Sequence, residues 1–215
     1  NAAGALFDVR TFNQGISASS FTADNGLDAA VNNAGTFRKS VGAGNYGVGV
    51  AFNNGATGIV DVQAGGFNFT GGGSHDGSAT LAAGATLAFG GGTHHVNAGA
   101  AFNGAGTWAV NGAGTVVNIN APLTVRSAFS QSGGTLQGGD LTLEGPTSLA
   151  ISSSLGMMTG DATTTLRGDT RIGGVNAFSL DAQRVLRNEG HVAPVGSIQL
   201  NRTNALGAGR IENAN

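Results

Sequence analysis

The chain of 215 residues contains no cysteine, three prolines and a single lysine. The absence of cysteine excludes disulfide bonds, thiol catalysis and zinc–thiolate sites. The small number of prolines excludes a collagen-like chain and a proline-rich linker. A long chain that is free of cysteine and poor in lysine suits bacterial secretion.

Charged residues are also scarce, at 10% of the chain against about 25% in an average soluble protein. Between Ser40 and Asn120 the only formal charges are Asp61 and Asp76. The segment from Ala121 onward carries seven arginines and seven acidic residues. Neither part is basic enough to form a phosphate-binding surface, so nucleic acid is not an expected partner.

Long hydrophobic runs are missing as well. No apolar run approaches the ~18 residues of a membrane span, and no signal peptide is visible at Asn1. The chain begins without methionine, so we expect it to be a processed or excised piece.

Glycine is abundant, at 39 of 215 residues, against an average usage of about 7%. Glycine richness with low charge is compatible with disorder, but disordered chains lack β-branched and aromatic residues and carry a high net charge. Here the net charge is −2, and valine, isoleucine, leucine and phenylalanine are spaced along the whole length. We therefore expect a folded chain with a continuous apolar core.

Similar sequence recurs along the chain. The pentapeptide NGAGT occurs at Asn103–Thr107 and again at Asn111–Thr115, and an apolar, alternating run follows each copy. A longer pair of similar segments is AGGFNFTGGGSH at Ala64–His75 and AGATLAFGGGTH at Ala83–His94. Their alignment gives a repeat of about 20 residues, within which strands recur about every eight residues.

Short strands separated by tight turns account for both periods. Alternating apolar residues predict strands at Ile59–Val62, Thr86–Phe89, Val116–Ile119 and Leu141–Leu143. Glycine, asparagine, aspartate and serine bound these segments and supply the turns, because glycine and asparagine tolerate positive φ.

Helices are not expected, because no segment of ten or more residues combines apolar 3.6-residue periodicity with good helix formers. The nearest candidate, Ala177–Arg187, fits a pair of strands with a turn at Asp181–Gln183 about as well. A sandwich or barrel of hairpins is the alternative all-β fold, but hairpin proteins seldom repeat similar sequence at this spacing. A parallel solenoid requires such repetition, since like residues stack about 4.8 Å apart on successive coils.

The sequence therefore predicts an all-β fold, a single continuous parallel β-helix (β-solenoid) over residues 1–215. About 20 residues per coil would give roughly ten coils. We expect Phe67, Phe69, Leu87 and Phe89 to point inward and to stack. Outward positions carry threonine, serine and asparagine, and need little charge.

Two long stretches carry a family resemblance. They are Gly35–Val96, which begins GTFRKSVGAGNYGVGV, and Gly133–Gly174, which begins GGTLQGGDLTLEG. Both resemble the repeats of very long bacterial secreted and surface proteins, the β-solenoid adhesins of the autotransporter-passenger-like or filamentous-haemagglutinin-like kind. The resemblance covers the chain from about Asn32 to its end. It implies a right-handed parallel β-helix outside the cell with adhesive or scaffold roles, and it offers no catalytic motif.

The two ends of the chain resemble an internal junction. The start, Asn1–Phe7 (NAAGALF), and the end, Arg210–Asn215 (RIENAN), are similar to Asn32–Phe37 (NNAGTF). Terminal coils of solenoids are exposed sheet edges that normally carry caps, and no cap is visible in the sequence. Self-association, head-to-tail or against adjoining coils of the same protein, is expected to involve Asn1, Leu6, Phe7, Arg210, Ile211 and Asn215.

His75, Asp76, His94 and His95 are the only cluster of metal-ligand residue types. With a repeat of about 20 residues, His75 and His94 stack on adjacent coils, where imidazoles a few Å apart can bind Zn²⁺ or Cu²⁺. The competing interpretation is a stacked histidine pair on a solvated face. We favour it because the sequence names no third ligand, so no cofactor is expected.

Isolated aspartates near glycines do not predict a calcium site. Asp24–Gly26 (DNG) and Gly160–Thr163 (GDAT) lack the tandem acidic pattern of calcium-binding β-rolls, so we interpret them as turns. Asp61 and Asp76 are 15 residues apart, which does not match the repeat, so they are not expected to form an acid–base pair.

The remaining candidates each have a structural explanation beside a functional one. Acidic and arginine residues of the later part fit either a catalytic groove or, as we expect, surface ion pairs. They are Asp140, Glu144, Asp161, Asp169, Asp181, Arg167, Arg171, Arg184 and Arg187. Trp108 and Tyr46 are able to stack on sugar rings, but a single tryptophan in a repeat is more often a core or surface-strand residue. Turn and ladder roles are expected for Asn53, Asn54, Asn103, Asn111, Asn118 and Asn120.

The expected function is that of a non-enzymatic structural or adhesive segment of a secreted or cell-surface bacterial β-solenoid. Coil stacking and end-to-end association would form an extracellular rod, filament or biofilm matrix scaffold. The expected partners are the protein itself and host-cell or matrix glycans. The alternative is a carbohydrate-binding or polysaccharide-degrading β-helix, which would carry an acid cluster and an aromatic platform on one face.

Overall fold

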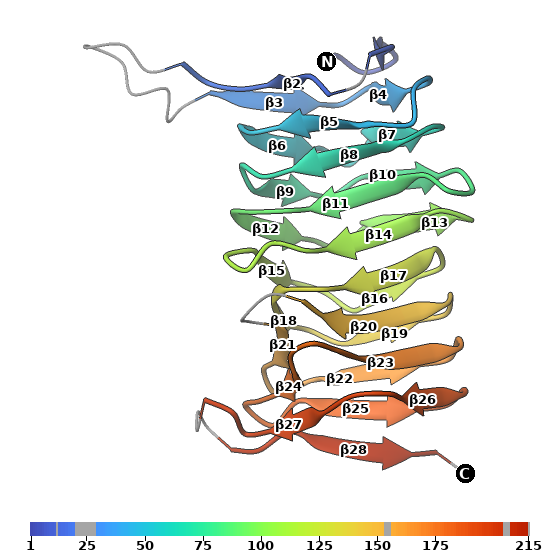
Figure 1. Cartoon of the computed structure of the whole chain (residues 1–215). Helices are drawn as coiled ribbons and strands as arrows, with labels where there is room; N and C mark the ends of the chain where they lie inside the picture. Colours follow the sequence, from blue (N-terminus) through green and yellow to red (C-terminus); the bar gives the residue numbers. More distant parts are fainter. Residues whose placement is uncertain (12, 20–28, 153–155, 204–206, 215) are drawn as a thin grey trace.

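The computed structural model describes residues 1–11, 13–19, 29–152, 156–203 and 207–214. It is an all-β solenoid with three parallel sheets, and the chain visits the three sheets in turn (Figure 1). Each coil therefore contributes one strand to each sheet. The described residues include no helix, and thus none long and apolar enough to cross a membrane.

Sheet A contains ten strands. In spatial order they are β1 (Leu6–Val9), β4 (Thr36–Lys39), β7 (Ile59–Val62), β10 (Ser78–Leu81), β13 (Ala101–Gly104), β16 (Leu123–Val125), β19 (Leu141–Leu143), β22 (Thr163–Leu166), β25 (Val185–Asn188) and β28 (Arg210–Asn213).

Sheets B and C contain nine strands each. Sheet B consists of β2 (Gly15–Ile16), β5 (Asn45–Val48), β8 (Gly66–Phe69), β11 (Thr86–Phe89), β14 (Thr107–Val110), β17 (Ala128–Gln131), β20 (Thr147–Ile151), β23 (Thr170–Gly174) and β26 (Val192–Pro194). Sheet C consists of β3 (Ala30–Asn33), β6 (Ala51–Asn54), β9 (Gly73–His75), β12 (Thr93–Val96), β15 (Val116–Ile119), β18 (Gly134–Gly138), β21 (Gly156–Thr159), β24 (Phe178–Leu180) and β27 (Ile198–Leu200).

The predicted fold class is confirmed, and the four strands predicted by residue range occur with the same bounds as β7, β11, β15 and β19. The segment Ala177–Arg187 forms the strand pair rather than a helix. Its turn places Ala182 and Gln183 at φ of 48° and 66°. The coil is about 22 residues long rather than 20. The interval varies from coil to coil, because the corners between the strands differ in length.

Alternate side chains of every sheet fill one core along the rod. Phe67 pairs with Leu87 and Phe69 with Phe89 on adjacent strands, and all four side chains are buried, as predicted. Aromatic rings continue this contact through most of the coils. The stacked and edge-on pairs link Phe7, Phe37, Phe52, Phe67, Phe69, Phe89, Phe102, Trp108 and Phe129.

Candidate functional site

The candidate metal cluster divides between the inside and the outside of the rod. His75 ends β9 and His94 lies in β12, and strand alternation turns both inward. The backbone register pairs His94 with Gly73 rather than with His75. Because Gly73 carries no side chain, the ring of His94 has room to extend toward His75. Nε2 of His75 lies 3.0 Å from Nδ1 of His94.

The hydrogen bonds fix the role of each ring nitrogen. Nε2 of His94 lies 2.9 Å from the carbonyl oxygen of Gly91, which can only accept. His94 therefore donates from Nε2, and its Nδ1 accepts from the Nε2–H group of His75. The contact between the two histidines was predicted correctly, but their expected place on a solvated face was wrong.

Burial keeps both rings uncharged. The ring of Phe89 stacks on His94 with centroids 4.0 Å apart and on His75 at 4.6 Å. Desolvation lowers the pKa of His75 to about 3, and repulsion from the other two histidines adds to this. Desolvation also lowers the pKa of His94 to about 4, against the raising effect of its backbone hydrogen bonds.

The third histidine does not join this pair. His95 faces outward, where its Nδ1 lies 3.5 Å from Nδ2 of Asn118. Over the residues that the structure describes, no three histidine, aspartate or glutamate side chains converge as a metal site. Nε2 of His75 faces Nδ1 of His94, and Nε2 of His94 faces Gly91, so the pair joins two coils.

The outward face of sheet C carries rows of amide and hydroxyl side chains. Asn53 donates to Asn32 at 2.8 Å, and Gln137 donates to Asn118 at 2.7 Å. Beside this row, Asn97 donates to Asp76 at 3.1 Å. The predicted ladder role is confirmed for Asn53 and Asn118, and also for Asn120, which donates to Asn97 at 2.7 Å.

A second amide ladder lies inside the corner that follows sheet C. Nδ2 of Asn1 donates to Oδ1 of Asn33, and Nδ2 of Asn33 donates to Oδ1 of Asn54, both at 2.8 Å. Nδ2 of Asn54 then donates to the carbonyl oxygens of Gly58 and Ser78. The ladder thus has one direction, with each amide donating to the next coil.

Charged side chains form a third ladder, on the outward face of sheet A and at the corner that follows it. Arg38 donates to Asp61 at 2.8 Å. Further along, Arg126 contacts Glu144, Arg167 lies between Glu144 and Glu189, and Arg187 contacts Glu189. For Glu144, Arg167 and Arg187, the predicted surface ion pairs are therefore present.

Two charged residues that we predicted on the surface are buried instead. Arg184 donates to Thr164 Oγ1 and to the carbonyl oxygens of Gly138 and Gly139. Burial lowers its pKa to about 10, so it remains charged at neutral pH. Oδ2 of Asp181 accepts from the backbone N–H and the hydroxyl of Thr203, both at 3.0 Å. Neither residue lies in an open groove.

The candidate sugar platform is not formed. Trp108 is fully buried and stacks on Phe102 with centroids 4.1 Å apart, so it cannot contact a glycan. Tyr46 is partly buried and packs edge-on against Phe67. Asp61 lies on sheet A, whereas Asp76 follows sheet C, so these two acids do not form a pair.

The remaining turn predictions have mixed outcomes. Asp161 is exposed in the turn between β21 and β22. Asn103 lies within β13, and Asn111 is exposed in the turn after β14. Asp24–Gly26 and Asn215 lie outside the described residues.

The first coil leaves apolar core residues at the surface. Phe7 stacks on Phe37 with centroids 5.0 Å apart but is 45% exposed, because no described strand covers its other side. Leu6, at 54% exposure, points outward beside it. The N-terminal ammonium group donates to the carbonyl oxygen of Asn32 at 2.7 Å, which fixes Asn1 against the first coil.

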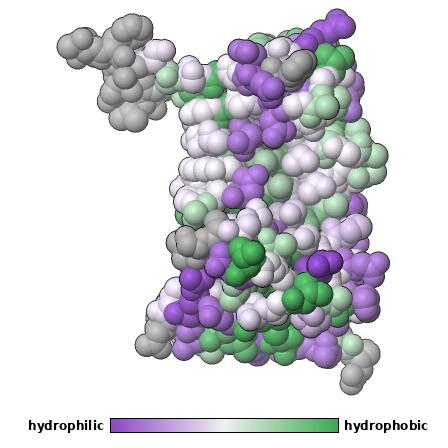
Figure 2. All heavy atoms as spheres, in the orientation of Figure 1, coloured by the Kyte–Doolittle hydropathy of each residue, from purple (hydrophilic) through white to green (hydrophobic). Residues whose placement is uncertain are grey.

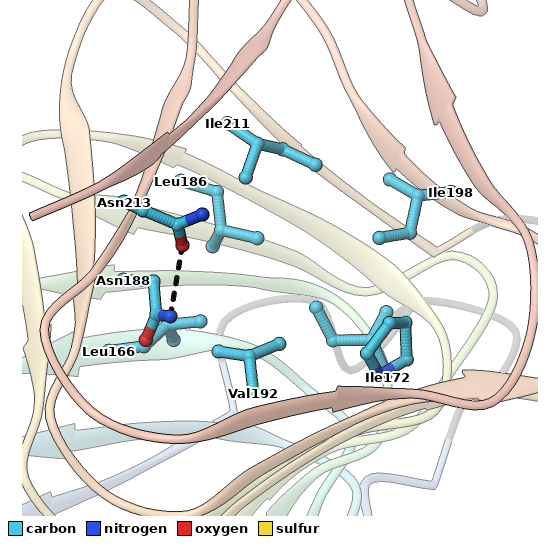
Figure 3. A pocket seen from close by; sticks show the side chains of 9 residues that line it. Leu166, Ile172, Leu186, Asn188, Val192, Ile198, Ile211 and Asn213 are labelled. Carbon is cyan, nitrogen blue, oxygen red and sulfur yellow. Dashed lines mark hydrogen bonds between the residues drawn. The ribbon is translucent and has the colours of Figure 1, made fainter.

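The last coil leaves part of its apolar interior accessible as a pocket (Figure 3). A pocket of about 230 Å³ lies between the final strands. Its lining residues are Leu166, Ile172, Leu186, Asn188, Val192, Pro194, Ile198, Ile211 and Asn213. Green apolar residues reach the surface at this lower end of Figure 2, whereas most of the side of the rod is pale. Sequence reasoning named Ile211 but missed the pocket around it.

Among the predicted association residues, Arg210 is exposed and pairs with Glu212 on its own strand at 2.7 Å. Both ends of the described rod thus present exposed sheet edges together with apolar side chains. No family model, no curated protein and no solved structure matches the chain.

Proposed function

We propose that the chain is a non-enzymatic structural or adhesive segment of a secreted or cell-surface bacterial β-solenoid, and that it forms part of an extracellular rod. The observation that supports this most is that polar side chains connect neighbouring coils. Imidazole, amide and carboxylate groups are the kinds of group that catalyse reactions in enzymes, but here they bind the side chains of the next coil. Their hydrogen bonds and ion pairs hold the rod together along its axis.

The faces of the rod also support a structural role. On the middle strands of sheet B, three neighbouring outward positions hold the small side chains of Ala88, Ala109 and Ser130, which stack in register. These side chains include no aromatic ring that could stack on a single sugar. The extracellular and bacterial parts of the proposal rest on the cysteine-free composition and the repeat style.

One observation favours glycans as partners of such a rod. The outward row of sheet C presents one polar side chain per coil, and amides make up most of it: Asn32, Asn53, Ser74, His95, Asn118 and Gln137. Rows of amides suit the hydroxyl groups of an extended polysaccharide. Binding along this row is compatible with an adhesive role and needs no catalytic residue.

The purified chain tests this proposal. Antibodies raised against it should label the outside of intact cells of the bacterium that produces it. Incubation with plant, bacterial and animal polysaccharides should release no reducing sugar. Sugar release that is lost in a Glu144→Gln variant would instead establish the polysaccharide-degrading alternative.

A further inference from the structure

We propose that Asn111 is a site of spontaneous modification, where the side-chain amide is lost and an aspartyl or isoaspartyl residue takes its place. The inference goes beyond the proposed function and does not depend on it, because the reaction needs only the chain and water. It follows from the different surroundings that the fold gives to identical Asn–Gly pairs.

An asparagine that precedes a glycine can react with its own backbone. The backbone nitrogen of the glycine attacks Cγ of the asparagine side chain, and the new N–C bond closes a five-membered succinimide ring. The attacking nitrogen loses its proton, and the side-chain nitrogen leaves as ammonia. Water then opens the ring at one of its two carbonyl groups, which gives an aspartyl or an isoaspartyl residue. Glycine favours the ring closure because it has no Cβ to obstruct it.

Four Asn–Gly pairs occur in the sequence, and three of them lie in the part of the chain that the structure describes. These three are Asn54–Gly55, Asn103–Gly104 and Asn111–Gly112. The fourth, Asn25–Gly26, lies outside the described residues. Because the reacting dipeptide is the same in each case, the fold decides which pair reacts.

Hydrogen bonds hold both reacting groups of Asn54–Gly55. The N–H of Gly55, which would be the nucleophile, donates to the carbonyl oxygen of Asn33 at 2.8 Å. The side chain of Asn54 is 3% exposed, its Oδ1 accepts from Nδ2 of Asn33, and its Nδ2 donates to two carbonyl groups. These bonds must break before the ring can close, so this pair reacts only when the corner opens locally.

Strand pairing restrains Asn103–Gly104. Both residues belong to β13, where they pair in register with Thr80 and Leu81 of β10. Gly104 lies so close to the neighbouring strand that a Cβ at this position would overlap the carbonyl oxygen of Leu81. Ring closure turns the backbone at the asparagine, so this pair must leave sheet A before it reacts.

Asn111–Gly112 has neither kind of protection. Asn111 is exposed in the corner between β14 and β15, and its side chain makes no hydrogen bond with any residue that the structure describes. The N–H of Gly112 also has no acceptor within the described ranges. Both reacting groups are therefore free in the folded chain.

The corner requires glycine at position 112. A Cβ there would overlap the carbonyl oxygen of Gly90 and would lie 2.5 Å from Oγ1 of Thr115. The carbonyl oxygen of Gly112 accepts from the N–H of Thr115 at 3.1 Å, which closes the turn. The packing of this corner therefore forces a glycine to follow Asn111, and the reactive pair results.

Conversion of Asn111 changes the part of the rod that has the fewest charges. Between Ser40 and Asn120 the formal charges are Asp61 and Asp76, and conversion adds a further carboxylate. The isoaspartyl product also lengthens the main chain by one methylene group where β14 leads into β15. Since the converted fraction increases with time, this residue records the age of the rod.

Mass spectrometry of the purified full chain tests the inference. The chain is incubated at neutral pH in water that carries a heavy oxygen isotope, both folded and in guanidinium chloride. Electron-transfer fragmentation then assigns the incorporated oxygen to each asparagine. In the folded chain we expect Asn111 to convert about tenfold faster or more than Asn54 and Asn103, which react only during local opening. In denaturant the three residues should convert at similar rates, because the unfolded chain presents the same dipeptide three times.

Two results would overturn the inference. One is a folded chain in which Asn111 converts no faster than Asn54 and Asn103. The other is an Asn111 that converts in denaturant but stays intact in the folded chain. Neither result affects the proposed function, because cell-surface labelling and the polysaccharide assay do not involve this residue. Polysaccharide cleavage, in turn, would remove the proposed function and leave the conversion of Asn111 unaffected.

An Asn111→Gln variant gives an independent readout. Glutamine would have to close a six-membered ring, which forms more slowly, and the exposed position tolerates the longer side chain. All samples carry Asn25→Gln, so that the pair outside the described residues does not contribute. Anion-exchange chromatography should show acidic species that accumulate with time in the parent chain and in the matched control Asn103→Gln, but not in Asn111→Gln. Equal accumulation in all three chains would overturn the assignment to Asn111.

Discussion

Two neighbouring histidines show how far the fold controls chemistry at the scale of a single residue. His94 and His95 are adjacent, but strand alternation turns the first into the core and the second to solvent. The buried ring has a pKa lowered to about 4, and it accepts a hydrogen bond from His75. A shift in register by two residues would not change this outcome, whereas a shift by one residue would exchange the inward and outward faces.

The first prediction is that acid destabilises the rod through this pair. Both histidines have a folded-state pKa below the unfolded value of about 6.5. Their unfolded forms therefore bind protons first, and stability falls as the pH drops from about 6.5 toward 4. The expected loss approaches 1.4 kcal/mol per pH unit for each ring. Urea unfolding at several pH values between 7 and 4.5 measures this slope.

Leucine variants identify the residues responsible. His75→Leu/His94→Leu should flatten the pH dependence, because it removes both titrating rings; it also leaves the carbonyl oxygen of Gly91 without its donor. His75→Leu alone should be less stable than the wild type at pH 7, since it leaves Nδ1 of His94 without a donor. His95→Gln is the control and should keep the wild-type slope. A double variant with the wild-type slope would exclude the pair as the source.

A second prediction at this scale concerns Phe89. Its ring is fully buried and contacts His94, Phe102 and Trp108. Phe89→Ala should lower the free energy of unfolding by about 3–5 kcal/mol, since it removes apolar contacts and leaves a cavity. Val175→Ala, at a position that is 86% exposed, should change it by less than about 0.5 kcal/mol. Chemical denaturation followed by circular dichroism compares the two, and a loss below about 1 kcal/mol for Phe89→Ala would contradict its core role.

At the scale of the strand, adjacent asparagines have different roles. In β6, Asn53 faces outward and donates to Asn32, whereas Asn54 is buried and belongs to the inner ladder. Asn54→Ala should cost about 1–3 kcal/mol, because it leaves Nδ2 of Asn33 and two carbonyl groups without their buried partner. Asn53→Ala should cost less than about 1 kcal/mol. Thermal unfolding of the two variants makes the comparison. Equal losses of stability would show that the inner ladder contributes no more to stability than the outer row.

Strands could be predicted from the sequence because alternation and turn residues are local signals. The bounds of β7 and β11 follow directly from runs such as IVDV and TLAF between glycines. The register between neighbouring strands was harder to predict from the sequence, since it depends on the length of the corners. The repeat alignment set His75 against His94, but the structure pairs His75 with Val96. The alternation of side chains along each strand nevertheless placed both histidines on the same, inward face.

Buried charges could not be predicted in this way. Lys39 occupies an inward rung between Val9 and Val62, where its Nζ donates to the carbonyl oxygens of Val41 and Gly42. Arg184 similarly donates to Thr164 and to two backbone carbonyl groups. Both depend on carbonyl groups that a particular corner turns inward, and no local sequence pattern reports that orientation. The charge ladder was easier to predict from the sequence, because Arg126, Glu144 and Arg167 alternate in charge at intervals of roughly one coil.

For the whole molecule, the parallel stack makes stability a sum of neighbouring contacts. Each coil of a solenoid contacts the coils before and after it, so a coil at an end has half the contacts of one in the middle. The ring stack reaches its densest point around Phe89, in the fourth set of three strands. Toward the C-terminus the core becomes mostly aliphatic, with Phe178 as an exception, and includes the buried Arg184 and Asp181. The middle and the last coils should therefore differ in local stability.

Hydrogen exchange measures this difference directly. Amides of β11 and β14 lie between paired strands in the aromatic part of the core, so their exchange should require opening of many coils. Amides of β26, β27 and β28 lie at an edge with mostly half-buried or exposed side chains, and should exchange about 100-fold faster or more. The experiment belongs at a low protein concentration, so that contacts between molecules do not contribute to protection. Equal protection at the centre and at the end would mean that all the coils open in one cooperative step, against the nearest-neighbour behaviour expected of a solenoid.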